Sequence, residues 1–124
     1  MKIYLMTEGE WKLYEDPLTE EFKKRNITIG EGATIGERAR IGEWARIQNS
    51  FDFILISNLG SRNATLTAYK HKDGIMIGTG CFLAPLDVFE KKVIEVHGDG
   101  IHGRDYQCAI KYIKERFKVI EVKR

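Results

Sequence analysis

The most constraining feature of the sequence is a six-residue repeat that runs from Ile27 to Ile47. An isoleucine recurs at one position of the repeat, a glycine follows each of the first three, and an alanine comes four residues after each of them. The positions are Ile29, Ile35, Ile41 and Ile47, then Gly30, Gly36 and Gly42, then Ala33, Ala39 and Ala45. Neither the helical nor the strand period produces this pattern. It predicts a coil that turns a corner once per repeat and points one branched side chain per side inward.

This repeat resembles that of left-handed parallel β-helices, in which three hexapeptides form one triangular coil. Residues 27–49 therefore supply about one coil. Stacked repeats need neighbours or caps, because a single coil leaves both ends of its interior open. We expect the rest of the chain, or other copies of it, to cover these ends. Trp44 occupies an outward position that a monomer would expose, which favours an oligomer with three-fold symmetry.

The length and composition indicate a single globular domain without a membrane-spanning segment. A chain of 124 residues with 43% hydrophobic residues is ordinary for a globular domain. No apolar run is long enough to span a bilayer and the N-terminus lacks a signal-peptide pattern, so we expect a cytoplasmic protein. A net charge of +2 gives no electrostatic support for binding duplex DNA. Cys81 and Cys108 form no metal-type pair and are expected to be reduced and buried.

Before the coil, the sequence predicts a β-hairpin over residues 1–14, with its turn at Thr7–Glu10. A short helix follows this hairpin. Asp16 is expected to cap the helix and Pro17 to occupy its first position, because proline fits where no backbone N–H is needed. Asn26 is expected to end the helix just before the coil begins.

After the coil, an apolar run over residues 50–62 reads as a bent continuation of it. Residues 64–82 alternate around Asp73-Gly74, which is a hairpin turn signal. Apolar residues at helical spacing then predict two helices, and a last strand follows them. The helix positions are Leu86, Phe89, Val93 and Val96, then Tyr106, Ile110, Ile113 and Phe117, and the strand residues are Val119, Ile120 and Val122.

The expected fold class is therefore α+β. We expect one domain over residues 1–124, with a coil over 27–49 and a hairpin and helix pair over 60–124. No linker composition separates these parts.

The repeat carries none of the groups that catalysis on such a coil requires. Acyltransferases with hexapeptide coils use several coils and a histidine base, and related carbonic anhydrases need three metal-binding histidines. His71, His97 and His102 all lie outside the repeat. We therefore expect no enzymatic activity, no metal and no cofactor.

Three glycine-containing segments can bind an anion or a flat ring, and each has a plain structural alternative. In Gly60–Asn63, the backbone N–H groups and Arg62 suit an anion, although an ordinary turn fits as well. In Gly78–Phe82, the phenylalanine can stack on a base or belong to the core beside a β-bulge. In His97–Tyr106, a helix start next to Arg104 suits a phosphate, or the segment is a surface connection.

The same segments, with their neighbours, resemble a module of phage and prophage proteins in which a hexapeptide segment comes first. The matching residues are Gly60-Ser61-Arg62, Tyr69, Asp73-Gly74-Ile75, Gly80-Cys81-Phe82, Leu86 with Phe89, His97-Gly98-Asp99 and Tyr106. Together with the coil, the resemblance spans residues 27–117. The chain looks like the phage-encoded Thoeris anti-defence sponge family.

This resemblance implies a small, multimeric, non-enzymatic protein that sequesters cyclic ADP-ribose-type signals made by TIR domains, and in some members cyclic oligonucleotides. It implies arginines on phosphates and an aromatic ring on a base, for which Arg62, Phe82 and Arg104 are the matching positions. Further candidates for ligand contacts are Arg25, Asn26, Lys92 and Tyr69. We expect a homo-oligomer, namely a hexamer made by pairing two trimers. Two other classes stay open: a hexapeptide acyltransferase-like protein with a degenerate coil, and a structural phage assembly protein.

Overall fold

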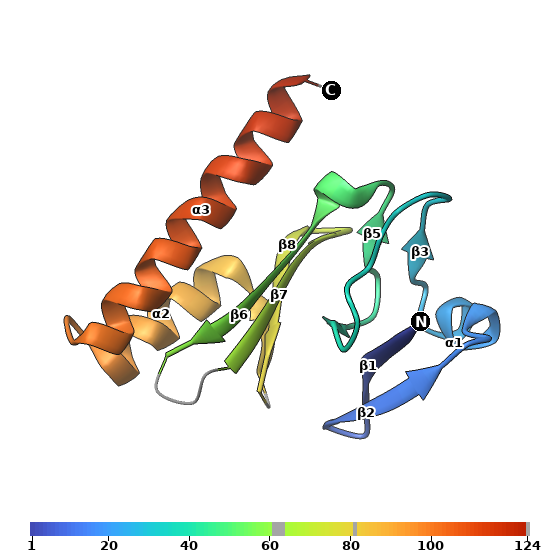
Figure 1. Cartoon of the computed structure of the whole chain (residues 1–124), viewed down its shortest axis with the longest axis horizontal. Helices are drawn as coiled ribbons and strands as arrows, with labels where there is room; N and C mark the ends of the chain where they lie inside the picture. The colour runs from blue at the N-terminus through green and yellow to red at the C-terminus, as the bar shows by residue number, and fades with distance from the viewer. Residues whose placement is uncertain (61–63, 81, 124) are drawn as a thin grey trace.

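The protein is a mixed α+β structure of several sheets and three α-helices in a computed structural model that describes residues 1–60, 64–80 and 82–123 (Figure 1). The strands are β1 (Lys2–Thr7), β2 (Glu10–Glu15), β3 (Thr28–Ile29), β4 (Arg40–Ile41), β5 (Arg46–Ile47), β6 (Phe53–Leu59), β7 (Ala64–His71), β8 (Gly74–Thr79) and β9 (Phe82–Pro85). The helices are α1 (Thr19–Lys24), α2 (Leu86–His97), α3 (Ile101–Lys123) and a short 3-10 helix, η1 (Ser50–Asp52). No helix in the described ranges is both long and apolar enough to cross a membrane.

The repeat forms the coil that its period predicts. Strands β3 and β5 pair in parallel, with Thr28 opposite Arg46 and Ile29 opposite Ile47, so each residue meets the one three hexapeptides later. The chain therefore returns alongside itself after three hexapeptides. The isoleucines and alanines of the repeat fill its interior: Ile35, Ala39, Ile41, Ala45 and Ile47 are buried, and Ile29 and Ala33 are partly buried. This confirms the inward orientation of the repeat residues.

The N-terminal segment packs on this coil. Strands β1 and β2 form the predicted antiparallel hairpin, and β1 also pairs in parallel with β4. Leu18, at the start of α1, is buried in the same core cluster as the coil. The predicted helix cap is wrong, because α1 begins after Leu18 without a side-chain cap and Asp16 instead pairs with the N-terminal amino group. Asn26 has a left-handed backbone with φ of 57°, as expected of a residue that ends a helix.

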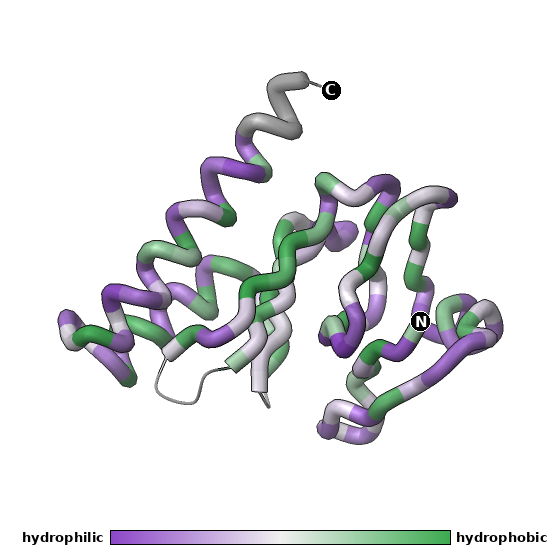
Figure 2. Tube along the Cα trace, in the orientation of Figure 1, coloured by the Kyte–Doolittle hydropathy of each residue, from purple (hydrophilic) through white to green (hydrophobic). Residues whose placement is uncertain are grey.

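The central sheet separates two apolar clusters. It is antiparallel in the order β6-β7-β8-β9, and Figure 1 shows α2 and α3 on one side of it and the coil, the hairpin and α1 on the other. Strand β6 is among the most hydrophobic runs of the chain in Figure 2. On the side of α2 and α3, residues of the sheet and of the two helices pack in one cluster: Ile54, Leu59, Leu66, Ala68, Ile77, Phe89, Val93, Ala109, Ile110, Ile113 and Phe117. Phe53 and Tyr69 join the coil cluster from the other face.

Side chains of the sheet also satisfy the backbone of the coil. The N–H of Arg40 donates to the hydroxyl of Thr67 at 2.9 Å, and the N–H of Gly42 donates to the hydroxyl of Tyr69 at 2.8 Å. Gly78 allows this close approach, because a Cβ there would lie 2.8 Å from the carbonyl oxygen of Arg40. The sheet therefore takes the place that a further turn of coil would occupy, and the chain supplies its own cover.

Several expectations for the C-terminal half are corrected. Residues 50–60 do not continue the coil, because η1 turns the chain and β6 then runs antiparallel to β7; residues 61 and 62 of the same predicted run lie outside the described residues. Residues 119–122 belong to α3 and form no strand, since no glycine or proline interrupts the helix before Lys123. Val96 is 58% exposed because it lies in the last turn of α2, where it lines a cavity and does not join the core stripe.

Trp44 is less exposed than the sequence suggests. It is half-buried, with the ammonium group of Lys72 4.3 Å and the guanidinium of Arg46 5.4 Å from its ring centroid. These cations cover part of the ring in one copy of the chain. Trp44 therefore gives no independent argument for an oligomer.

Candidate functional site

Three of the candidate residues lie at the helix pair, Phe82 and Lys92 on one cavity and Arg104 on another. Phe82 begins β9, Lys92 lies on α2, and Arg104 lies in the first turn of α3, where its N–H donates to Gly100 at 3.0 Å. Helix α3 returns along α2 (Figure 1), and α2 packs on β8 and β9 while α3 packs on β6. The site is therefore assembled by the helix pair and the last two strands.

A small aromatic cavity lies between α2, α3 and β9. It has a volume of about 150 Å³ and is lined by Thr79, Phe82, Phe89, Lys92, Val93, Val96, His97 and Tyr106. The rings form a continuous series. Phe82 is 5.7 Å from Phe89, Phe89 meets Tyr106 edge-on at 5.9 Å, and Tyr106 stacks on His97 at 5.4 Å. Such a wall suits a flat, apolar-faced ligand ring, and Lys92 adds one positive charge beside it.

Phe82 has features of both alternatives that the sequence left open. It packs against the core cluster through Phe89, and it is only half-buried and lines the cavity. It lies in a β8–β9 hairpin, where it pairs with Thr79, and no bulge interrupts that ladder. Gly80 takes the left-handed turn conformation, with φ of 47°.

A wider and more open cavity of about 450 Å³ lies next to the first turns of α3. Its lining residues are Gly60, Ile101, His102, Arg104, Asp105 and Cys108. Arg104 is exposed and forms no ion pair within the described part of the chain. The backbone N–H groups at the start of a long helix and an unpaired guanidinium both favour a phosphate.

The linings of the two cavities have no residue in common, but they include consecutive residues of α3. Asp105 lines the wide cavity and Tyr106 lines the aromatic one, and both also touch Gly60 at the end of β6. The turn that leads into α3 is tight, because a Cβ on Gly103 would lie 2.2 Å from the carbonyl oxygen of Gly98. A ligand that fills both cavities would therefore pass over Arg104–Tyr106.

Tyr69 is not available to a ligand, which corrects its assignment as a contact residue. Its side chain is fully buried between the sheet and the coil, and its hydroxyl accepts the hydrogen bond from Gly42. Burial raises the pKa of Tyr69 to about 12, an effect only partly offset by that hydrogen bond. Its role is to join the coil to the sheet.

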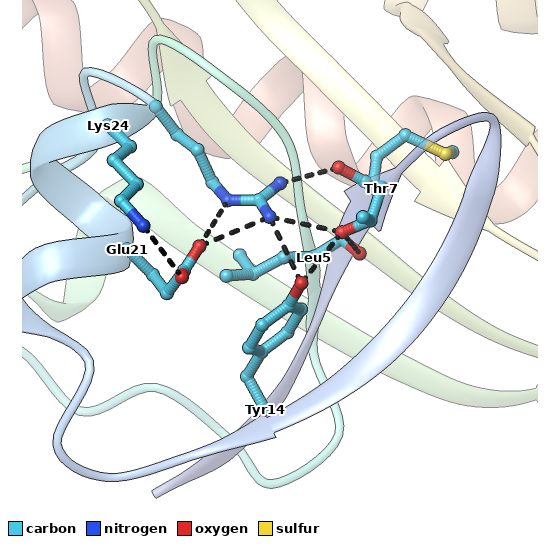
Figure 3. A network of polar contacts seen from close by, with 7 residues as sticks. Leu5, Thr7, Tyr14, Glu21 and Lys24 are labelled. Atoms are coloured by element: carbon cyan, nitrogen blue, oxygen red, sulfur yellow. Dashed lines mark hydrogen bonds and ion pairs between the residues drawn. The ribbon is translucent and has the colours of Figure 1, made fainter.

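Arg25 also has a structural role. It follows directly after α1, which lies across the central sheet from α2 and α3 (Figure 1). Its guanidinium pairs with Glu21 at 3.3 Å and donates to the hydroxyls of Thr7 and Tyr14 (Figure 3). It also donates to the carbonyl of Met6, and its side chain is only 13% exposed. These contacts tie α1 to the β1–β2 hairpin, so Arg25 does not join the site at the helix pair. Asn26 next to it accepts a hydrogen bond from Arg46 through its backbone carbonyl.

The structure describes some of the remaining residues named from the sequence but not all of them. Arg62 lies outside the described residues, as does Cys81. Cys108 is free but exposed, which corrects the expectation of a buried thiol. The described residues contain no group of three or more His, Cys, Asp or Glu side chains that could hold a metal ion.

Sequence reasoning named His97 and Tyr106 as parts of a pattern but not as lining residues of a site. Asp105 lies inside the candidate segment His97–Tyr106, but nothing in the sequence singles it out. Tyr106 is the first residue of the apolar stripe of α3, and this position is the one sequence signal for the aromatic series. Nothing near Asp105 in the sequence points to Gly60, 45 residues away.

Comparison with known proteins gives no match: no family model, no curated protein and no solved structure is significantly similar to this chain. The function therefore has to be argued from the chain's own residues.

Proposed function

We propose that this protein binds a phosphorylated nucleotide across the two cavities at the α2–α3 end and holds it without reacting with it. The observation that carries the proposal is the adjacency of an aromatic cavity with a wider cavity that contains the unpaired Arg104. Stacking groups and anion-binding groups are the two requirements of nucleotide recognition. Binding alone needs no general base in the site.

The sizes of the cavities suggest how such a ligand would divide between them. About 150 Å³ suits a single base stacked among Phe82, His97 and Tyr106, and is below the range usual for a whole drug-sized ligand. Phosphates and ribose would then lie in the open cavity, where Arg104 and His102 are donors. Lys92 would sit beside the base or its nearest phosphate.

Within this class, the resemblance of the sequence narrows the ligand to a cyclic ADP-ribose-type immune signal. The protein would then be a phage-encoded sponge that inhibits Thoeris defence by sequestering that signal in the host cytoplasm, with cyclic oligonucleotides as further ligands.

A ligand panel tests the proposal directly. The purified protein is mixed with cyclic ADP-ribose, its glycosidic isomers, cyclic oligonucleotides and acyl-CoA, and affinity is measured by calorimetry. Heat then releases the bound material for chromatography. We expect one cyclic ADP-ribose isomer to bind and to be recovered intact. A modified product would indicate an enzyme, and the absence of binding to every cyclic nucleotide would remove the sponge proposal.

Two substitutions test the assignment of the site. A charge-assisted phosphate contact contributes about 1.5–3 kcal/mol and base stacking about 1–3 kcal/mol. Arg104→Ala and Phe82→Ala should therefore each weaken binding by roughly ten- to a hundredfold at about 1.4 kcal/mol per decade. Lys91→Ala, on the exposed face of α2, is the matched control and should bind like the parent. Unchanged affinity in folded Arg104→Ala and Phe82→Ala proteins would move the site elsewhere.

Thermal melting without ligand separates the two roles of Phe82. If the ring served only the core, its removal would lower stability by up to about 3–5 kcal/mol without a specific loss of affinity in the folded fraction. Because the ring is half-buried, we expect a smaller loss of stability together with the loss of binding.

We also propose that the protein assembles as a hexamer, formed by two trimers whose three-fold axes run along the coils. The coil, which we take to be left-handed like the β-helices it resembles, is only about one turn long. Phe51, which follows the coil closely, remains 62% exposed in one copy of the chain, and burial in an interface would remove it from water. Multi-angle light scattering at micromolar concentration should report six chains. A stable monomer would contradict the assembly but leave the ligand proposal intact.

A further inference from the structure

We infer that Asp105 is a positioning residue of this site: it holds the end of β6 against the first turns of α3 and so fixes one wall of the wide cavity. The expected effect on ligand binding rests on the proposed function, whereas the contact between Asp105 and the end of β6 rests on the geometry of the described residues. Asp105 lies between Arg104, which lines the same cavity, and Tyr106, which lines the aromatic one.

The direct contact is a hydrogen bond between elements that are distant in the sequence. The backbone N–H of Gly60 donates to a carboxylate oxygen of Asp105 at 2.9 Å. An ionised acceptor makes such a bond stronger than one between neutral groups. Gly60 is the last described residue before the connection to β7, so this bond anchors the point at which that connection leaves the sheet.

Tyr106 restrains the same residue from a second direction. A Cβ on Gly60 would lie 2.6 Å from both the ring edge and the hydroxyl oxygen of Tyr106, so the ring packs directly on the glycine backbone. Gly60 also has a φ of 69°, a conformation that favours glycine. Two consecutive residues of α3 thus fix the position of Gly60, which is itself a lining residue of the wide cavity.

The charge of Asp105 makes this role testable. A carboxylate that lines a cavity for phosphates repels them, so electrostatics alone predicts that its removal improves binding. A positioning role predicts the opposite for any variant that loses the hydrogen bond. Asparagine separates the two effects, because its amide oxygen can still accept from Gly60 while the negative charge is gone.

The experiment compares Asp105→Ala with Asp105→Asn, using the panel nucleotide that the parent binds. We expect Asp105→Ala to weaken binding by about tenfold, the usual weight of one hydrogen bond to a charged group. Asp105→Asn should bind as tightly as the parent or more tightly. Asp99→Ala, in the exposed turn before α3, changes the net charge equally and should show no loss. Tighter binding by both Asp105 variants would show that the carboxylate only repels the ligand. Equal weakening by both would show that its negative charge at the start of the helix matters and that its hydrogen bond does not. Either result overturns the inference.

A measurement without ligand keeps the inference separate from the proposed function. Amide hydrogen exchange at Gly60 should be faster by about tenfold in Asp105→Ala and parent-like in Asp105→Asn, because only the former loses the acceptor. Unchanged exchange in Asp105→Ala would overturn the positioning role even if the parent binds a nucleotide. Accelerated exchange in Asp105→Ala, combined with a parent protein that binds no nucleotide, would show that the anchor exists and that the proposed function has failed.

Discussion

Replacement of Ile41 by aspartate is expected to prevent folding. Ile41 is fully buried in the coil, where β4 pairs with β1 and Ile41 stands opposite the equally buried Leu5. An unpaired carboxylate in that interior costs several kcal/mol, or the group takes up a proton at a similar cost. Because a domain of this size is stable by only about 5–15 kcal/mol, the change removes much or all of its stability. Far-UV circular dichroism and urea unfolding would measure the loss.

The matched control for this substitution places the same side chain on the outside of the coil. Thr28 is exposed on β3, and its hydroxyl lies 3.5 Å from the guanidinium of Arg46. Thr28→Asp should therefore stay within about 0.5 kcal/mol of the parent, as exposed substitutions usually do. A folded Ile41→Asp protein with parent-like stability would contradict the inward orientation of the repeat isoleucines.

The coil could be predicted from the sequence because its signal is local and repeated. Each hexapeptide shows the same inward isoleucine, and the observed pairing of Thr28 with Arg46 follows from three such units per turn. The two C-terminal helices were predicted for the same reason, since Ile110, Ile113 and Phe117 recur at helical spacing and are all buried. Where apolar residues recur at a fixed period, their burial can be inferred without knowing which segment packs on them.

The contacts between the coil and the central sheet could not be predicted, because they join segments with different periods. The alternation of side chains predicted along β7 is correct, but it predicts only that Thr67 and Tyr69 lie on the same face of the strand. It does not show that this face is buried under the coil, where both hydroxyls accept backbone hydrogen bonds. The resemblance that makes Tyr69 a candidate ligand contact rests on its place in a motif and carries no information about this burial. Arg25 was misassigned for a similar reason, since its partners lie in a hairpin that its own neighbours do not specify.

The candidate site was predicted in its residue types better than in its geometry. Phe82, Lys92 and Arg104 come from three elements, and only the folded structure shows that the first two line one cavity and Arg104 another. The anchor between Gly60 and Asp105 depends on a single hydrogen bond across 45 residues. A single bond of that kind leaves no periodic trace in a sequence.

Substitution of Gly30 by alanine is the second change with a large expected effect. The N–H of Gly30 donates to Ile47 at 2.7 Å, and a Cβ at this position would lie 1.9 Å from the carbonyl oxygen of Gln48. The obstructing atom belongs to the backbone of the next turn of the coil, so it cannot rotate away. Relief requires β3 and β5 to separate, and each contributes only two residues to their pairing. We expect a loss of about 3 kcal/mol or more, at the upper end of overpacking effects.

Two further glycines of the repeat show whether stacking of the backbone is the cause. A Cβ on Gly36 would lie 2.6 Å from a terminal methyl group of Leu55, which can rotate, so Gly36→Ala should cost about 1 kcal/mol or less. Gly32 has open space around it but a φ of 79°, so Gly32→Ala should cost about 1–2 kcal/mol from backbone strain alone. Urea unfolding of the three variants should therefore give the largest loss for Gly30→Ala. If Gly30→Ala cost no more than Gly36→Ala, the turn-on-turn contact of β3 with β5 would be absent in solution, and the coil would have to be held together by its apolar interior alone.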